Sequence, residues 1–150
     1  MALHLVTGGN GYLGSFIVRE LLRRGESVRS IDVADTIFEE SGAEYYKTDV
    51  LDKNGLRKVM KGVDCVHHNS ALVPLRKAGD HFRKVNVDGT RNVLEIAKEC
   101  GVRHLSHMSS SAIYGSINKE DCPITHQTRL QPIEIYGQSK LDGEEIICQE

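Results

Sequence analysis

Short apolar stretches alternate along the chain with segments in which apolar residues recur every three or four positions. The apolar stretches predict buried strands, and the spaced segments predict amphipathic helices. Such alternation is typical of βαβ units that build a parallel sheet. We expect strands at Leu3–Thr7, Ser27–Asp32, Ala43–Thr48, Cys65–Asn69 and His104–Ser109.

The segments between these strands predict helices. In the first of them Gly25 provides a helix end, and its apolar face is formed by Leu13, Ile17 and Leu21, flanked by Val18 and Leu22. The predicted helices are Gly11–Arg24, Asp52–Met60 with Asp52 as its N-cap, Asp80–Cys100, and a last one that begins near Ile135 and continues at Glu150. Residues 112–133 are predicted to form a loop. We therefore expect an α/β fold, a Rossmann-like doubly wound parallel sheet with the strand order 3-2-1-4-5.

The turn after the first strand is dense in glycine. It reads Gly8-Gly9-Asn10-Gly11-Tyr12-Leu13-Gly14 and leads directly into a helix. Glycines at this spacing permit a tight turn and a close approach of the backbone to a pyrophosphate, which the helix N-terminus attracts. A tight turn into a buried helix can also select glycine without any ligand. Because Ser15 follows Gly14 where a P-loop carries lysine, the P-loop alternative is excluded.

A second pattern lies near the end of the sequence. Tyr136 and Lys140 are four residues apart, which places a phenol and an ammonium group on the same face of the last helix. A nearby cation favours the phenolate form, as an acid/base group requires. Ser109-Ser110-Ser111 ends the fifth strand, at the carboxyl edge where open α/β sheets bind ligands. The glycine turn, the serines and the Tyr-Lys pair together predict one ligand site at that edge.

Composition narrows the class of protein. The 150 residues suffice for one domain, and 39% hydrophobic with 27% charged residues is ordinary for a soluble α/β protein. A net charge of −2 predicts no nucleic-acid partner, and no apolar run approaches the roughly 20 residues of a membrane helix. The four cysteines lie far apart, which indicates reduced thiols. Because the sequence opens on a strand without a signal peptide, we expect a cytoplasmic protein.

Seven histidines raise the question of a metal site. His67 and His68 adjoin at the end of the fourth strand, while His104 and His107 lie on the fifth. Neighbouring residues of a strand point to opposite faces, so His67 and His68 cannot hold one ion together. We expect no metal site and interpret these histidines as residues of the core or of a site wall.

These motifs give the chain a resemblance to a known family. They are Thr7–Gly14, Asp32, Thr48–Val50, Asn69–Ala71, Val85–Thr90, Ser109–Gly115 and the pair Tyr136 and Lys140. In this order the chain resembles the extended short-chain dehydrogenase/reductase family, of the NAD-dependent epimerase/dehydratase type, over all 150 residues. The resemblance implies an enzyme that uses NAD and acts on a secondary alcohol or ketone, with a nucleotide sugar as the expected small-molecule substrate. It also allows a homodimer.

The resemblance implies roles for individual residues as well. Counting back four residues from Tyr114 selects Ser110 as the hydroxyl that binds the substrate oxygen. Tyr136 would exchange a proton with the substrate, and Lys140 would assist Tyr136 and hold the nicotinamide ribose. The other implied cofactor residues are Gly8, Gly11, Tyr12, Leu13 and Gly14 for the pyrophosphate, Asp32 for the adenosine ribose, Asp49 and Val50 for the adenine, Asn69, Ser70 and Ala71 for the nicotinamide-side ribose, and Asn86 in the packing and water network beside the site.

Two departures from the family pattern narrow the reaction. Sugar dehydratases carry an Asp-Glu pair after the catalytic hydroxyl, where this chain has Ser111-Ala112, so dehydration is disfavoured. Galactose 4-epimerases usually carry a lysine shortly after the fourth strand, where this chain has Leu72-Val73-Pro74, which weakens the epimerase interpretation. A simple redox step on an alcohol or ketone survives both. A hydroxysteroid- or flavonoid-type dehydrogenase/reductase and a non-catalytic NAD-binding sensor or interaction module remain alternatives.

Family members are much longer than this chain, which stops within the helix that carries Lys140. We therefore expect residues 1–150 to be an NAD-binding Rossmann domain, truncated before the substrate-binding part and without turnover of its own. Ile146 and Ile147 should then expose part of the face that a further strand would cover.

Overall fold

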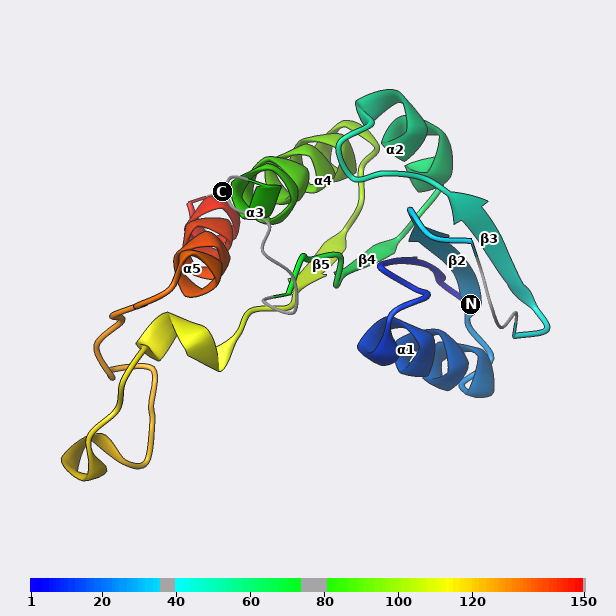
Figure 1. Ribbon diagram of the computed structural model, residues 1–150. Coiled ribbons are helices and arrows are strands. Elements are labelled where there is room, and N and C mark those ends of the chain that lie inside the picture. Colours follow the sequence, from blue (N-terminus) through cyan, green and yellow to red (C-terminus); the bar gives the residue numbers. More distant parts are fainter. Residues whose placement is uncertain (36–39, 74–80, 150) are drawn as a thin grey trace.

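A five-stranded parallel sheet forms the centre of the molecule (Figure 1). The computed structural model describes residues 1–35, 40–73 and 81–149. Because every pair of neighbouring strands is parallel, the carboxyl ends of all five lie on one edge. The predicted fold class and strand order are confirmed, and the last three strands end one or two residues earlier than predicted. The strands, in their order across the sheet, are β3 (Ala43–Lys47), β2 (Ser27–Asp32), β1 (Leu3–Thr7), β4 (Cys65–His68) and β5 (His104–His107).

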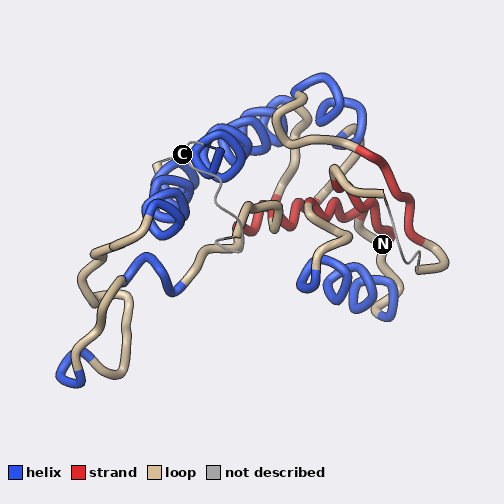
Figure 2. The backbone as a smooth tube through the Cα atoms, in the orientation of Figure 1, coloured by secondary structure: helices blue, strands red, loops and turns tan. Residues whose placement is uncertain are grey.

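Helices cover both faces of the sheet, and strand alternation divides the core between them (Figure 2). Helix α1 (Tyr12–Arg23) lies below the strands in this view, where it packs Val18 against Val6 and Val28. Helices α2 (Lys53–Met60) and α4 (Gly89–Glu99) lie above them. The larger cluster of buried residues fills that side, and it includes Leu5, Ile31, Leu56, Val66, Val93 and Ile96. Helix α5 (Ile135–Cys148) contacts α4 at the β5 end of the sheet.

The ends of the first two helices follow the predicted signals closely. Gly11 is the N-cap of α1, and Gly25 adopts a φ of 79° just after its last turn. Asp52 is the N-cap of α2, as predicted, and its carboxylate accepts a hydrogen bond from the Asn54 amide at 3.0 Å. One detail of the predicted apolar face is wrong. Leu13 is 40% exposed, because it sits in the first turn of α1, beyond the edge of the sheet.

The long helix predicted at Asp80–Cys100 is three shorter pieces. A single helical turn, α3 (His81–Arg83), runs into a π-helical segment, η1 (Lys84–Asp88), and then into α4, while Asp80 lies outside the described residues. Asn86 and Val87 of this segment are buried. Apolar spacing cannot reveal a π-helical turn, because the turn interrupts the spacing by only one residue. Such turns occur often at functional sites.

The stretch predicted as a loop, residues 112–133, contains short helices. A 3-10 helix, η2 (Ser111–Tyr114), follows β5 directly, and another, η3 (Lys119–Asp121), lies in the excursion beyond it. After this excursion the chain comes back to η2, where the backbone amide of Gln131 donates a hydrogen bond to the Ile113 carbonyl at 3.0 Å. Helix α5 begins at Ile135, as predicted, and ends at Cys148, whereas Glu150 lies outside the described residues. Among the helices that the structure describes, none has the length and apolar character needed to cross a membrane.

Candidate functional site

A cleft runs along the carboxyl edge of the sheet, where two adjoining pockets share the backbone of the glycine turn and the segment after β4. One pocket, of about 340 Å³, lies at the β2–β3 side, and the other, of about 490 Å³, reaches α5. Gly8, Gly11, Asn69 and Ala71 line both. The sequence-predicted residues that line one or both pockets are Gly8, Gly11, Tyr12, Leu13, Gly14, Asp32, Asp49, Val50, Asn69, Ser70, Ala71, Tyr136 and Lys140.

The glycine turn brings bare backbone to the middle of the cleft. Gly8 has a φ of 68°, which other residues rarely adopt. A Cβ on Gly14 would lie 2.1 Å from the Gly8 carbonyl oxygen, so only glycine permits this approach. The N-cap Gly11 has no side chain to bond the first amides of α1, and the amides of a first helical turn have no partner within the helix. These amides and the helix dipole fit a pyrophosphate.

Asp32 stands at the end of β2 and lines the smaller pocket. Its carboxylate accepts hydrogen bonds from the amides of Asn10 at 3.1 Å and Ala34 at 3.0 Å, which fix it beside the glycine turn. Arg29, the cation on the same strand, pairs with Glu44 of the neighbouring strand β3 and bonds the carbonyl of Lys61 at the end of α2. Asp32 therefore presents its negative charge to the pocket without interference from Arg29.

Tyr136 and Lys140 enter the cleft from the first turns of α5. This helix lies close to η2, and Gly137 permits the approach because it has no side chain. A Cβ at this position would lie 2.6 Å from the Ala112 carbonyl oxygen. The ring of Phe82 meets the Tyr136 ring edge-on at 6.2 Å. Lys140 is only 3% exposed, and burial lowers the pKa of its ammonium group to about 8, against the opposing effect of Glu144.

The structure separates the serines that follow β5. Ser110 is the N-cap of η2, and its hydroxyl accepts a hydrogen bond from the Ala112 amide at 3.2 Å. Ser109 lines the larger pocket together with Tyr136 and Lys140, and its buried hydroxyl has no hydrogen-bond partner within the described residues. The family resemblance selects Ser110, and the role of Ser110 stays a prediction. The geometry adds Ser109 as a second candidate hydroxyl.

Other residues also line the cleft, although the sequence analysis gave them no role in binding the cofactor or the substrate. Leu72, His81 and Val85 line the smaller pocket, and Val73 and Met108 line the larger one. Asn86 does not line either pocket among the described residues, and instead it is buried behind the cleft, where its side chain bonds Leu72 and Ser139. His81 of α3 and Val85 of the π-helical segment reach the smaller pocket. Pro74, the last residue of the Leu72-Val73-Pro74 departure, lies outside the described residues.

The paired histidines of β4 point to opposite faces, as predicted. His68 is fully buried on the α4 side, where its ring bonds Thr7 and Thr90. On the other face His67 bonds His4 at 3.0 Å, and the two rings stack. His107 on β5 packs its ring against that of His68, with centroids 5.3 Å apart. Burial lowers the pKa of His68 to about 3 and that of His107 to about 4, and the charge of Lys140 adds to both shifts.

We expect acid to destabilise the fold through His68 and His107. Both imidazoles stay neutral in the folded chain, while in the unfolded chain they take up protons below a pKa of 6.5. The contribution of these two groups to stability is therefore fully present above pH 6.5 and falls as the pH drops toward 4, with a loss of about 4 kcal/mol for the pair between pH 7 and pH 5. Urea unfolding at the two pH values measures this loss.

His107→Phe isolates one half of the effect, since both ring nitrogens of His107 are buried without a hydrogen-bond partner in the described part of the chain. The variant should lose about half as much stability on acidification as the parent chain. The exposed His126 serves as the control, because His126→Gln should keep the full dependence. An unchanged pH dependence in His107→Phe would contradict the assignment.

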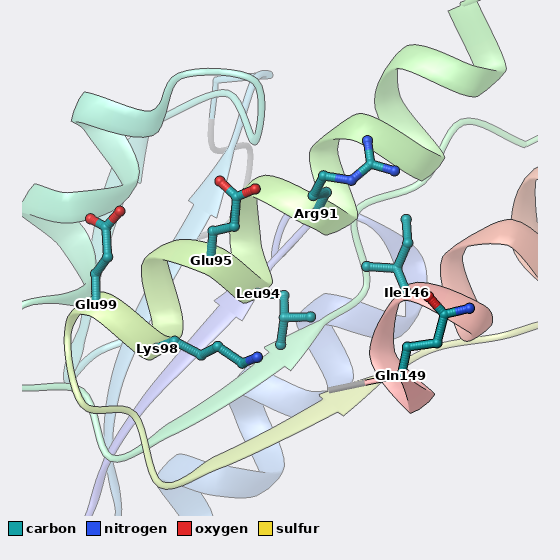
Figure 3. Close-up of a pocket in the computed structure, with 7 residues that line it drawn as sticks. All are labelled: Arg91, Leu94, Glu95, Lys98, Glu99, Ile146 and Gln149. Atoms are coloured by element: carbon teal, nitrogen blue, oxygen red, sulfur yellow. The ribbon is translucent and has the colours of Figure 1, made fainter.

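A third hollow, of about 510 Å³, lies between α4 and α5, away from the glycine turn (Figure 3). Figure 3 shows Leu94 of α4 and Ile146 of α5 at its centre, with charged side chains around them. Ile146 and Ile147 are half-buried, and the expectation that a further strand covers this face stays a prediction. None of the residues predicted for the site lines this groove, which is not a part of the cleft.

Comparisons with known proteins agree with this architecture. A family model described as the 3-beta hydroxysteroid dehydrogenase/isomerase family matches residues 5–150. The UDP-glucose 4-epimerase of Streptomyces lividans is 33% identical over 98% of this chain and 47% of its own length. The sterol-4-alpha-carboxylate 3-dehydrogenase (decarboxylating) of Homo sapiens is 33% identical over 91% of this chain and 36% of its own length.

A solved structure of a short-chain dehydrogenase/reductase is also similar to this chain. A short-chain dehydrogenase/reductase superfamily protein from Agrobacterium tumefaciens, crystallised with bound NAD, matches with a TM-score of 0.87 and 34% identity. The match covers 97% of this chain and 44% of that protein. The chain thus spans less than half the length of each of these relatives. The family model and the solved structure confirm the resemblance seen in the motifs. Because the family model matches residues 5–150, the chain belongs to the 3-beta hydroxysteroid dehydrogenase/isomerase family of short-chain dehydrogenases/reductases.

Proposed function

We propose that this chain is the cofactor-binding and proton-transfer part of an NAD-dependent enzyme that interconverts a secondary alcohol and a ketone. One observation carries the proposal. The buried Lys140 and the neighbouring Tyr136 line the same cleft as the bare backbone of the glycine turn, with Asp32 at its other end. A purely structural glycine turn explains neither the buried ammonium group nor the carboxylate held at the far end.

The residues of the cleft fit NAD. The first amides of α1 offer hydrogen bonds to the pyrophosphate, and Asp32 offers acceptor oxygens to the adenosine ribose. In the proposal Asp49 and Val50 hold the adenine, and Asn69, Ser70 and Ala71 hold the nicotinamide-side ribose, which is supported by their place in the lining of the cleft. The chemistry that NAD supplies when bound is the acceptance or donation of a hydride.

The protein then has to move one proton. In the proposal Tyr136 takes the proton of the substrate hydroxyl during oxidation and returns it during reduction. Lys140 stabilises the phenolate by its charge and bonds the ribose. Ser110 holds the substrate oxygen, with Ser109 as the alternative because it lines the pocket beside Tyr136. Comparing Ser110→Ala with Ser109→Ala in an active form decides which hydroxyl lowers kcat when it is lost.

A nucleotide sugar is the proposed substrate, and support comes from the similarity to a UDP-glucose 4-epimerase. The match to a steroid dehydrogenase family model and the likeness to a sterol dehydrogenase favour a second candidate, a hydroxysteroid. A longer form of the chain, assayed with NAD against UDP-sugars and against 3-beta-hydroxysteroids, separates the two. Turnover of neither class, with NAD bound, would favour the sensor alternative. A cytoplasmic location belongs to the same proposal, supported by the four free thiols.

We expect NAD to bind more tightly than NADP. The 2′-phosphate of NADP would meet the Asp32 carboxylate, which Arg29 does not neutralise, and this repulsion should weaken NADP by about tenfold or more. Titration of both cofactors by calorimetry measures the ratio. Asp32→Asn should lower the preference for NAD over NADP. Asp35→Asn removes the same charge at a residue that is paired with Lys47, and it should leave this preference unchanged. Equal or tighter binding of NADP by the parent chain would overturn the assignment.

A further inference from the structure

A line of buried hydrogen bonds begins behind the glycine turn, at Thr7. The Thr7 hydroxyl accepts hydrogen bonds from the amides of Asn69 and Ser70, both at 3.1 Å. A hydroxyl oxygen has two acceptor sites and one proton. With both acceptor sites used, the proton can only be donated to Nδ1 of His68, which lies 2.8 Å away.

This donation fixes the state of His68. A ring whose Nδ1 accepts a hydrogen bond must carry its proton on Nε2 when neutral. Nε2 lies 3.0 Å from the Thr90 hydroxyl and donates to it, and Thr90 donates in turn to the Asn86 carbonyl at 2.7 Å. His68 is fully buried, and His107 and Lys140 are the titratable groups that act on it from β5 and α5. A second positive charge beside Lys140 is unfavourable, so the ring stays neutral.

The line continues from Asn86 to the helix that carries the predicted catalytic pair. The Asn86 amide group donates to the Ser139 hydroxyl at 3.0 Å and to the Leu72 carbonyl at 3.1 Å. Ser139 donates to the Tyr136 carbonyl at 2.7 Å. Thr90 reaches the backbone carbonyl of Asn86, and the Asn86 side chain continues to Ser139, so residues of β1, β4, η1, α4 and α5 connect the glycine turn to the backbone of Tyr136 through buried hydrogen bonds and the backbone of Asn86.

We propose that His68 is a positioning residue that sets the place of Tyr136 and Lys140 relative to the cofactor cleft. The inference rests on the proposed function and deepens it. His68 touches neither pocket, and it acts through Thr90 and Asn86 on the helix that bears both groups. Its Nδ1 accepts a hydrogen bond and its Nε2 donates one, so the direction of every hydrogen bond from Thr7 to the Asn86 carbonyl is fixed. Loss of the ring leaves the Thr7 hydroxyl without an acceptor and frees the π-helical segment to shift.

The state of the ring is tested on the chain itself. Nitrogen-15 NMR of the histidine side chains should show His68 with its proton on Nε2 and without titration from pH 8 down to pH 5. A proton on Nδ1 of His68, or titration above pH 5, overturns the proposal whether or not the chain belongs to an active enzyme.

The positioning role is tested by matched variants. His68→Leu should lower kcat of an active longer form by about 10- to 100-fold while KM for NAD changes little, because displacement of catalytic groups by an ångström has effects of that size. His68→Gln, which keeps one acceptor and one donor, should recover most of the loss. His67→Leu, on the opposite face of the same strand, should leave kcat unchanged.

A readout without turnover separates this proposal from the proposed function. NAD added to the parent chain should shift the amide resonances of Gly11 and Gly14 and also those of Ser139 and Lys140. In His68→Leu the first pair should still shift, and the second should not. If NAD shifts neither pair in the parent chain, the proposed function fails. If all four still shift in His68→Leu and its kcat equals that of the parent, the positioning role fails.

Discussion

Tyr136→Phe should lower kcat of an active longer form of this chain by about 10²–10⁴-fold, the range that a positioned acid or base contributes. The substitution removes a single oxygen from a ring that Phe82 already holds edge-on, so the shape of the cleft survives. The affinity for NAD should stay close to that of the parent, because the phenol exchanges its proton with the substrate. Steady-state kinetics with a saturating substrate and an independent titration of NAD measure the two quantities.

Two further variants sharpen this test. Tyr114→Phe removes the same oxygen from a tyrosine that ends η2 and lines neither pocket. The enzyme with this substitution should keep the kcat of the parent. Lys140→Met should damage both turnover and NAD binding, since the proposal gives the ammonium group both tasks. Near-normal rates in Tyr136→Phe would show that another group moves the proton.

Gly14→Ala should abolish NAD binding and lower the free energy of unfolding by about 3 kcal/mol or more. The new Cβ would lie 2.1 Å from the Gly8 carbonyl oxygen and 2.9 Å from the Gly9 Cα, both backbone atoms that no rotamer change can move. Relief of such an overlap requires α1 to shift away from the glycine turn, at a cost in the upper part of the overpacking range. The same shift withdraws the first amides of the helix from the pyrophosphate.

Gly101→Ala is the matched control for Gly14→Ala. Gly101 has a φ of 73°, but no atom lies within 4 Å of the position that a Cβ would take there, so alanine meets backbone strain without any overlap. The cost should be about 1–2 kcal/mol, and the affinity for NAD should not change. Urea unfolding and calorimetry on both variants test the pair. Binding of NAD by Gly14→Ala at the parent affinity would show that the glycine turn is only structural.

Local patterns predicted most of the fold because the strands are short and bounded by clear signals. Gly25 and Asp52 mark helix ends that the structure reproduces. The π-helical segment was beyond the reach of sequence patterns, since it depends on tertiary contacts of buried Asn86 and on the tight fit of Gly89 against Val50, where a Cβ would lie 2.7 Å away. The short helices after β5 were missed because propensity says little about three- or four-residue turns.

The site was predictable where a residue's position follows from the end of a strand. Asp32 is the last residue of β2, and Asn69 directly follows the last residue of β4. The parallel sheet therefore brings both to the same edge. His81 and Leu72 reach the cleft only through the path of the chain between β4 and α4, which no spacing rule describes. The serines show the same limit, because the bend after β5 decides which hydroxyl faces the pocket and which caps a helix.

The π-helical segment has a consequence for insertions and deletions. A residue advances an α-helix by about 100°, so one extra residue in a turn rotates everything that follows by that angle. Phe82 before the segment and Val93 after it are both buried. Their shared inward direction depends on the wider turn between them. Deletion of one residue within Lys84–Asp88 would restore a uniform helical phase and turn one of these two faces toward solvent, so the segment has to keep its length as well as its buried Asn86.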